Sequence, residues 1–161
     1  MINKKSAALL AGATMIGAIQ GGADTLSRQH LFAFATELGL AFQLQDDLLD
    51  AYGTEAQLGK PIGGDIVEGK KSFLMLTAFA EADAPTRKRL QSLLEDKAMA
   101  PEDKIREVLT LYNSLGVKEI AEREINAHFT KAMDSLASLE VGAERVEPLR
   151  ELAQSLLGRN K

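Results

Sequence analysis

The sequence contains no cysteine and no tryptophan, and only two of its 161 residues are histidines. The absence of cysteine excludes disulfide bonds, thiolate metal ligands and a cysteine nucleophile. Two histidines make a zinc site built from several histidines hard to assemble. The chain therefore has no thiol chemistry, and its two histidines do not suggest a zinc site.

Positive charge is also in slight deficit. The sequence has 19 lysines and arginines against 23 aspartates and glutamates, which gives a net charge of −4 and a pI of about 5.3. This balance argues against a general nucleic-acid-binding surface. Hydrophobic residues make up 45% of the chain, as in soluble globular proteins, and the length fits one domain. We therefore expect a cytoplasmic protein with no nucleic-acid partner.

Charged residues are missing from Ser6 to Ala23, a segment that follows two lysines. A basic start before an apolar stretch is typical of a secretory signal peptide. Glycines, a threonine and a glutamine dilute this stretch, however, so it is too polar for a good membrane span. Its larger apolar residues recur at the spacing of a helix packed on other helices. We favour such a helix of small residues and expect no stable membrane insertion.

Alternation of apolar and polar residues, which is typical of strands, is scarce, and most of the chain has helical periodicity. Glycines end the predicted helices, and Pro85, Pro101 and Pro148 stand where helices begin. The predicted helices cover about residues 4–20, 25–51, 65–81, 85–96, 101–115, 117–139 and 148–158. A glycine-rich loop joins the second helix to the third. The sequence therefore predicts an all-α, antiparallel helical bundle.

The histidines fit structural positions. His128 lies in an apolar helical pattern with Ile125, Phe129 and Ala132, which favours a partly buried structural histidine. His30 has no metal-ligating residue at a suitable spacing.

An acidic stripe is the most informative feature of the chain. On a helix, Gln43, Asp46, Asp47 and Asp50 fall within an arc of about 100°, and nearly every other residue from 38 to 49 is apolar. A helix that is apolar on most sides is surrounded by protein, so the carboxylates must face an internal cleft that penalises their charge. Internal basic residues or a hard cation such as Mg²⁺ could neutralise them. The alternative is a solvated acidic patch at the end of a helix, which the apolar surroundings disfavour.

A glycine-rich loop with basic residues follows the stripe. It carries Lys60 and Lys70, with Asp65 between them. Glycines allow the backbone to approach a ligand closely. Carboxylates with nearby ammonium groups suit a metal–phosphate cluster, because the carboxylates hold the ion while the ion and the lysines hold the phosphate oxygens.

The order of these residues resembles a known family. Phe42-Gln43, then Asp46-Asp47-Leu-Leu-Asp50, then Gly59-Lys60, Gly64-Asp65 and Lys70 resemble the second aspartate-rich motif, and the loop after it, of the trans-isoprenyl diphosphate synthases, or polyprenyl synthetases. This family includes farnesyl and geranylgeranyl diphosphate synthases. Lys5-Ser6 resembles the family's Lys-Thr motif, with Ser6 in place of the usual threonine.

The resemblance implies an all-α fold of the isoprenoid synthase type around a deep apolar cavity. It implies Mg²⁺-assisted departure of diphosphate from an allylic diphosphate, followed by condensation with isopentenyl diphosphate. The residues that it implies as magnesium ligands are Asp46, Asp47, Asp50 and Asp65. Those that it implies for catalysis are Lys5, Gln43 and Lys60. Those that it implies for substrate binding are Lys5, Ser6, Phe42, Gln43, Lys60 and Lys70.

The resemblance covers only the C-terminal half of the family. Members have two aspartate-rich motifs and are about twice as long, whereas this chain has one such motif. We therefore expect residues 1–161 to be the C-terminal part of a polyprenyl synthetase domain, an incomplete bundle that is inactive alone. Apolar faces such as those of Leu9, Ile16 and Phe34 then lack partners, and we expect a homodimer or higher oligomer to cover them.

Two alternatives remain open. The chain could be a non-catalytic helical subunit or partner of a heteromeric prenyl synthase, an interpretation that the absent first motif favours and the retained aspartates and lysines oppose. It could also belong to a related terpenoid enzyme that ionises a diphosphate without condensation. Phe42-Gln43 and the lysine-bearing loop favour the condensing family.

Overall fold

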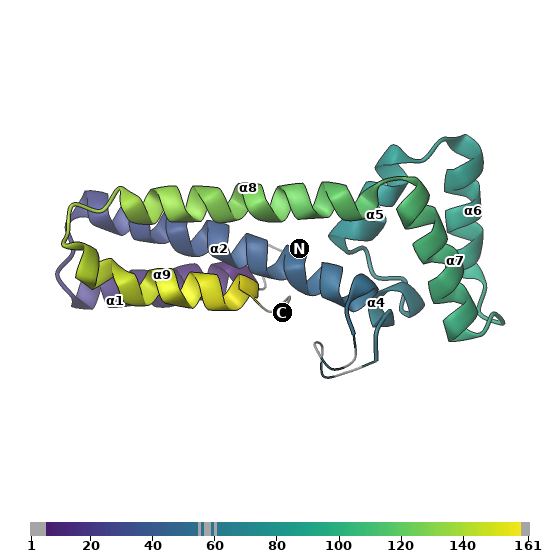
Figure 1. The fold of residues 1–161 in the computed structure, drawn as a ribbon, viewed down its shortest axis with the longest axis horizontal. Helices are drawn as coiled ribbons and strands as arrows, with labels where there is room; N and C mark the ends of the chain where they lie inside the picture. Colours follow the sequence, from purple (N-terminus) through teal and green to yellow (C-terminus); the bar gives the residue numbers. More distant parts are fainter. Residues whose placement is uncertain (1–5, 55, 57–58, 60, 159–161) are drawn as a thin grey trace. The chain divides into compact units, whose positions relative to one another are not determined.

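The computed structural model describes residues 6–54, 56, 59 and 61–158, and this part of the chain is helical and contains no strand. The chain divides into two compact units, Met1–Leu44 with Glu124–Lys161, and Gln45–Arg123. The predicted all-α class is confirmed. The elements are α1 (Ala8–Gln20), α2 (Thr25–Tyr52), α4 (Gly64–Val67), α5 (Phe73–Glu81), α6 (Ala84–Glu95), α7 (Pro101–Ser114), α8 (Val117–Ala137) and α9 (Ala143–Leu157) (Figure 1).

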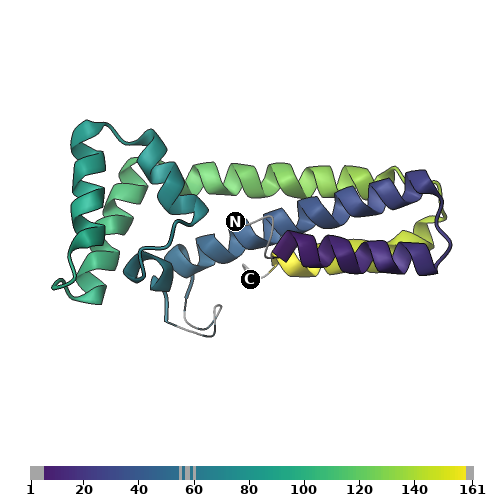
Figure 2. The same ribbon diagram turned by 180° about the vertical axis from the view of Figure 1, so that it is seen from behind.

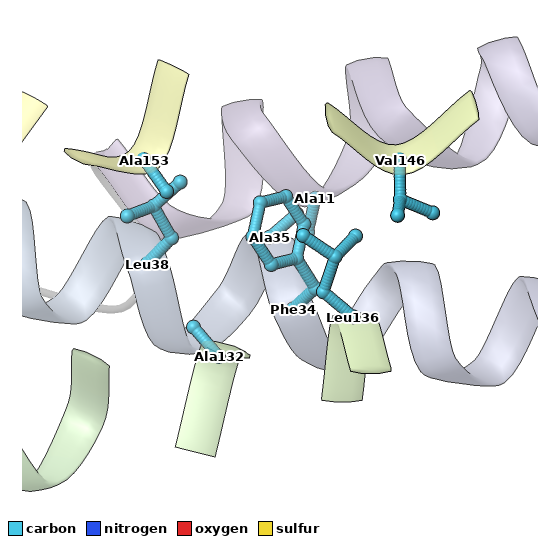
Figure 3. Packing of buried hydrophobic residues seen from close by; sticks show 8 residues of the cluster. All are labelled: Ala11, Phe34, Ala35, Leu38, Ala132, Leu136, Val146 and Ala153. Atoms are coloured by element: carbon cyan, nitrogen blue, oxygen red, sulfur yellow. The ribbon is translucent and has the colours of Figure 1, made fainter. Parts of the chain in front are cut away.

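The first unit is built from α1, α9 and parts of α2 and α8, which run lengthwise and share one core (Figures 1 and 2). Every one of these four helices contributes an alanine or another apolar side chain to that core (Figure 3). The small residues let the backbones approach closely, since a Cβ atom on Gly39 would lie 2.5 Å from the Cα atom of Ala7. The core residues are Ala11, Phe34, Ala35, Leu38, Ala132, Leu136, Val146 and Ala153.

The uncharged N-terminal segment forms α1 and buries Ala7, Ala11 and Ala18. This agrees with the predicted helix of small residues. Among the described residues, we find no helix that is both long and apolar enough to cross a bilayer.

The second unit contains α4 to α7. Asp83 caps α6 by accepting a hydrogen bond from the Thr86 N–H at 2.9 Å. At the other end of α6, the buried Lys104 donates from Nζ to the carbonyl oxygen of Asp96 at 2.6 Å. This bond joins the start of α7 to the end of α6, and the two helices lie side by side (Figure 1).

Two helix boundaries differ from the sequence prediction. The helix predicted over residues 65–81 is two helices, because Gly69 takes a φ of +64° and Ser72 begins α5 as its N-cap. The last helix begins at Ala143 instead of near Pro148, which lies inside it. The turn that precedes Pro148 carries Val146, which is buried in the core of the first unit.

The apolar residues that were expected to lack partners differ in their solvent exposure. Leu9 is 76% exposed and Ile16 is 65% exposed, as predicted. The prediction for Phe34 is wrong, since this side chain is 2% exposed and lies in the core of the first unit. His128 is partly buried and its Nδ1 lies 2.6 Å from Glu37 Oε2, which confirms its structural interpretation.

Phe32 and Phe34 provide a matched pair on one helix, because Phe32 is 47% exposed. We predict that Phe34→Ala lowers the free energy of unfolding by about 3–5 kcal/mol, the usual range for truncating a buried phenylalanine. Phe32→Ala should lower it by less than about 1 kcal/mol. Urea denaturation followed by circular dichroism measures both, and equal losses for the two variants would contradict the assigned core.

Candidate active site

The acidic stripe lies on α2, which continues without interruption from Thr25 to Tyr52. Leu44, Leu48 and Leu49 hold this stretch in place by being buried beside the stripe. The carboxylates of Asp47 and Asp50 are themselves buried, whereas Asp46 is half-buried. The alternative of a solvated acidic patch is therefore wrong for two of the three aspartates.

Asp50 binds the turn that begins α4. Its Oδ2 accepts a hydrogen bond from the Asp65 N–H at 2.9 Å, and its carbonyl oxygen accepts one from the Gly63 N–H at 2.6 Å. Gly63 has a φ of +79°, and a Cβ atom there would lie 2.5 Å from Ile105 Cδ1. The turn therefore requires glycine for its backbone conformation and for its packing on α7.

Asp47 binds the start of α5. Its Oδ2 accepts a hydrogen bond from the N–H of Phe73, the first residue of that helix, at 3.1 Å. Ser72 caps the same turn by accepting from the Met75 N–H at 3.4 Å. A carboxylate is favourable at this end of a helix because the backbone dipoles place partial positive charge there.

Lys70 lies between these two attachment points. Its Nζ is 2.5 Å from Asp65 Oδ1 and 3.3 Å from Glu68 Oε2, and 47% of its side chain is exposed. The hydrogen bond to Asp65 is the main cause of a pKa of Lys70 above its usual range, with further contributions from the charges of Asp65 and Glu68. Lys70 is therefore protonated at neutral pH, with its ammonium group paired to two carboxylates and partly open to solvent.

Two tyrosines lie close to this group. Tyr52 donates from Oη to Asn113 Oδ1 at 3.0 Å, and the buried Tyr112 donates from Oη to Met75 Sδ at 3.6 Å. Burial raises the pKa of Tyr112, and electrostatic interactions with Tyr52, Asp65 and Asp47 raise it further. The motifs do not single out either tyrosine; the signal for Tyr112 is its place on the apolar face of α7 with Val108.

A separate group of predicted residues lies in the first unit. Ser6 donates from Oγ to Gln43 Oε1 at 2.8 Å, which brings together two residues that are 37 positions apart. Ser6 and Phe42 also line an apolar groove of about 380 Å³. Lys5 and Lys60 lie outside the described residues. The other residues that line this groove are Leu9, Leu10, Ala13, Gly39 and Leu156.

The donor set of the second unit suits a hard cation. Within the described part of the chain, no three histidine or acidic side chains come close enough to hold one ion between them. Carboxylate oxygens are the protein ligands that Mg²⁺ prefers, and this ion usually takes one or two of them together with water or phosphate oxygens.

The chain belongs to the polyprenyl synthetase family, whose sequence model matches residues 1–112. It is 37% identical over 159 residues to a short chain isoprenyl diphosphate synthase of Methanothermobacter thermautotrophicus, which covers 99% of this chain and 48% of that protein. The predicted family is confirmed. The chain spans about half the length of the curated relatives it matches.

Solved structures of isoprenyl synthases also match this chain over about half of their own length. The crystal structure of a geranylgeranyl pyrophosphate synthase superposes with a TM-score of 0.89 at 28% identity, over 99% of this chain and 50% of that one. A geranylgeranyl pyrophosphate synthase from Corynebacterium glutamicum, complexed with isoprenyl diphosphate and magnesium, superposes with a TM-score of 0.87 at 28% identity, over 98% of this chain and 45% of that one. The fold is therefore that of the isoprenyl synthases.

Tyrosine ionisation tests the environment of the site, because Tyr52 and Tyr112 are the only tyrosines of the sequence. Burial, with a contribution from Glu119, raises the pKa of Tyr52 to about 12, and the pKa of Tyr112 is also raised. An unfolded tyrosine ionises at a pH of about 10, whereas in the folded chain both hydroxyl groups stay neutral until the pH reaches their higher pKa values. Their contribution to stability is complete below pH 10 or so and is lost as the pH rises through the folded pKa values.

We therefore predict that tyrosinate absorbance of the native chain shows no midpoint near pH 10 or so, whereas the chain in denaturant shows one there. Tyr52→Phe should remove the transition near pH 12 and leave the later one. A native midpoint at a pH of about 10 would contradict the raised pKa values of the two tyrosines.

Proposed function

We propose that this chain carries the metal- and diphosphate-binding part of a trans-prenyltransferase of isoprenoid biosynthesis. The reaction condenses an allylic diphosphate with isopentenyl diphosphate. The observation that supports this proposal is the arrangement of the second unit, where a buried helix holds an acidic stripe beside the loop that presents Lys70. This arrangement falls within the part of the chain that matches the polyprenyl synthetases.

Departure of diphosphate needs positive charge at the leaving group. Lys70 supplies one such charge, and its ammonium group donates to phosphate oxygens in the proposed complex. Asp46 is the carboxylate of the stripe that we propose as the direct contact to Mg²⁺. When bound, Mg²⁺ neutralises charge on the departing diphosphate. By the motif match, Lys5 and Lys60 are proposed to contact the same diphosphate.

The allylic cation needs apolar walls that exclude water. In the first unit, Phe42 lines an apolar groove beside the hydrogen-bonded pair of Ser6 and Gln43. We propose that Phe42 and Gln43 lie near the reacting carbon atoms of the allylic substrate. The hydrogen bond from Ser6 holds the Gln43 amide in one orientation, which a polar contact to the substrate requires.

A second candidate function is that of a helical subunit of a heteromeric prenyl synthase. The exposure of Leu9 and Ile16 on α1 favours a chain that pairs with another chain. We propose an oligomer in both cases, and the two functions differ in whether the acidic stripe of this chain binds an ion.

Calorimetry with inorganic diphosphate, with and without Mg²⁺, separates them. We predict saturable binding that requires Mg²⁺, loss of that binding in Asp46→Ala, and binding about tenfold weaker in Lys70→Ala, as expected when a charge-assisted contact is removed. Asp103→Ala is the matched control, because Asp103 is a half-buried aspartate of the same unit that pairs with Arg106. Wild-type protein that is folded but binds no diphosphate would favour the structural subunit.

We further predict that the purified chain alone does not condense the two diphosphates, because its sequence has one aspartate-rich motif where the family has two. Turnover should appear when the N-terminal half of a relative, cut at the matching position, is added. A radiolabelled isopentenyl diphosphate assay measures both. Efficient condensation by this chain alone would contradict the prediction.

A further inference from the structure

We propose that Asp47 and Asp50 are positioning residues, which hold the two ends of the segment that carries Lys70 and do not bind Mg²⁺ directly. Residues 63–73 are called the Lys70 segment below. The inference rests on the proposed function, because it divides the acidic stripe of that site into residues that contact the ion and residues that place the neighbouring cation.

The two carboxylates are attached to opposite ends of the Lys70 segment. Asp50 accepts from the Asp65 N–H at 2.9 Å, near the start of the segment. Asp47 accepts from the Phe73 N–H at 3.1 Å, at its end. Since Asp47 and Asp50 are neighbours on one face of α2, a single rigid helix determines where both ends of the segment lie.

The segment is short and hydrogen-bonded within itself. The N–H of Val67 donates to the Gly63 carbonyl at 3.0 Å, and the N–H of Lys70 donates to the Asp65 carbonyl at 2.9 Å. The Lys70 side chain then returns to the carboxylate of Asp65, so its ammonium group is tied to the residue that Asp50 holds. Movement of either end of the segment therefore displaces the cation that the proposed site uses.

Burial argues against direct metal binding by these two aspartates. Asp50 is 2% exposed and Asp47 is 7% exposed. Mg²⁺ dehydrates reluctantly and usually keeps several of its water ligands, which need room beside the carboxylate. Asp46 precedes Asp47 on the same helix and is half-buried, so the hydrated ion has better access to it.

Substitution by asparagine and by alanine distinguishes a positioning residue from a magnesium ligand. A backbone N–H needs an acceptor oxygen, which the amide of asparagine also provides. A magnesium ligand needs the negative charge, which asparagine lacks. An aspartate that acts as a positioning residue is therefore replaceable by asparagine and not by alanine, whereas a ligand is replaceable by neither.

The experiment compares Asp47→Asn with Asp47→Ala, and Asp50→Asn with Asp50→Ala, using two readouts. The first is hydrogen exchange of the Phe73 and Asp65 amides in the free chain. The second is the Mg²⁺ concentration at half-saturation and the Kd for inorganic diphosphate, both from calorimetry. Asp46→Asn is the comparison for a ligand. Asp83→Ala controls for loss of a helix cap, because Asp83 caps α6.

We expect Asp47→Ala to accelerate exchange of the Phe73 amide and to weaken diphosphate binding, each about fivefold, the factor that corresponds to loss of a typical helix cap. Asp47→Asn should restore both, with an unchanged Mg²⁺ half-saturation. The Asp50 pair should behave in the same way at the Asp65 amide. Asp46→Asn should shift the Mg²⁺ half-saturation and leave exchange unchanged, and Asp83→Ala should change neither readout at the site.

The proposal is overturned if Asp47→Asn shifts the Mg²⁺ half-saturation as much as Asp46→Asn does. It is also overturned if Asp47→Ala leaves Phe73 exchange unchanged. Should an alanine variant fail to fold, the asparagine variant still decides through the Mg²⁺ titration. Hydrogen exchange requires neither ion nor diphosphate, so a wild-type chain that binds no diphosphate would count against the proposed function while exchange still decides the role of Asp47.

Discussion

Two buried carboxylates on one helix face are the constraint on which the second unit depends. Like charges one turn apart repel, and removal from water penalises each of them. Backbone N–H groups offset this penalty at both positions, since Asp50 accepts from Asp65 and Asp47 accepts from Phe73. The loop after α2 is therefore bound to the helix because the carboxylates need donors, and the loop in turn gains a fixed position for Lys70.

The same constraint explains the residues around the stripe. Gly63 is required because the loop must turn back to reach Asp50 while it packs against Ile105, where a side chain does not fit. Tyr112 lies in the interior near Asp47 and Asp65, so its hydroxyl group is neutral and bonds to Met75 instead of facing the carboxylates as an anion. The apolar faces of α2 supply the burial that makes these polar contacts necessary.

Periodicity was sufficient to predict the features that depend on one helix at a time. The all-α class, the extent of α2 and the grouping of the aspartates on one face follow from residues three and four apart. Features that depend on contacts between helices could not be predicted in this way. The break before α5 depends on the positive φ of Gly69 and on the hydrogen bond from the Phe73 N–H to Asp47. Phe34 is buried because α8 and α9 pack on it. Pro148 suggested the start of a helix, yet α9 begins one turn earlier, at Ala143, where the preceding turn packs on the core.

The two units differ in how much of their candidate site is formed by contacts within the unit. In the second unit, the hydrogen bonds from the Asp65 N–H to Asp50, from the Phe73 N–H to Asp47 and from Lys70 to Asp65 all lie within residues 45–123. In the first unit, Leu9 and Ile16 of the uncharged helix α1 are exposed, and Leu9 lines the same groove as Ser6 and Phe42. The proposed ion and diphosphate contacts of Asp46 and Lys70 belong to the second unit, whereas the proposed enclosure of an allylic chain needs the exposed face of α1 to be covered. The proposal therefore separates the contacts that hold an ion and diphosphate from the enclosure that condensation needs, and it assigns the missing part of that enclosure to a further surface over α1.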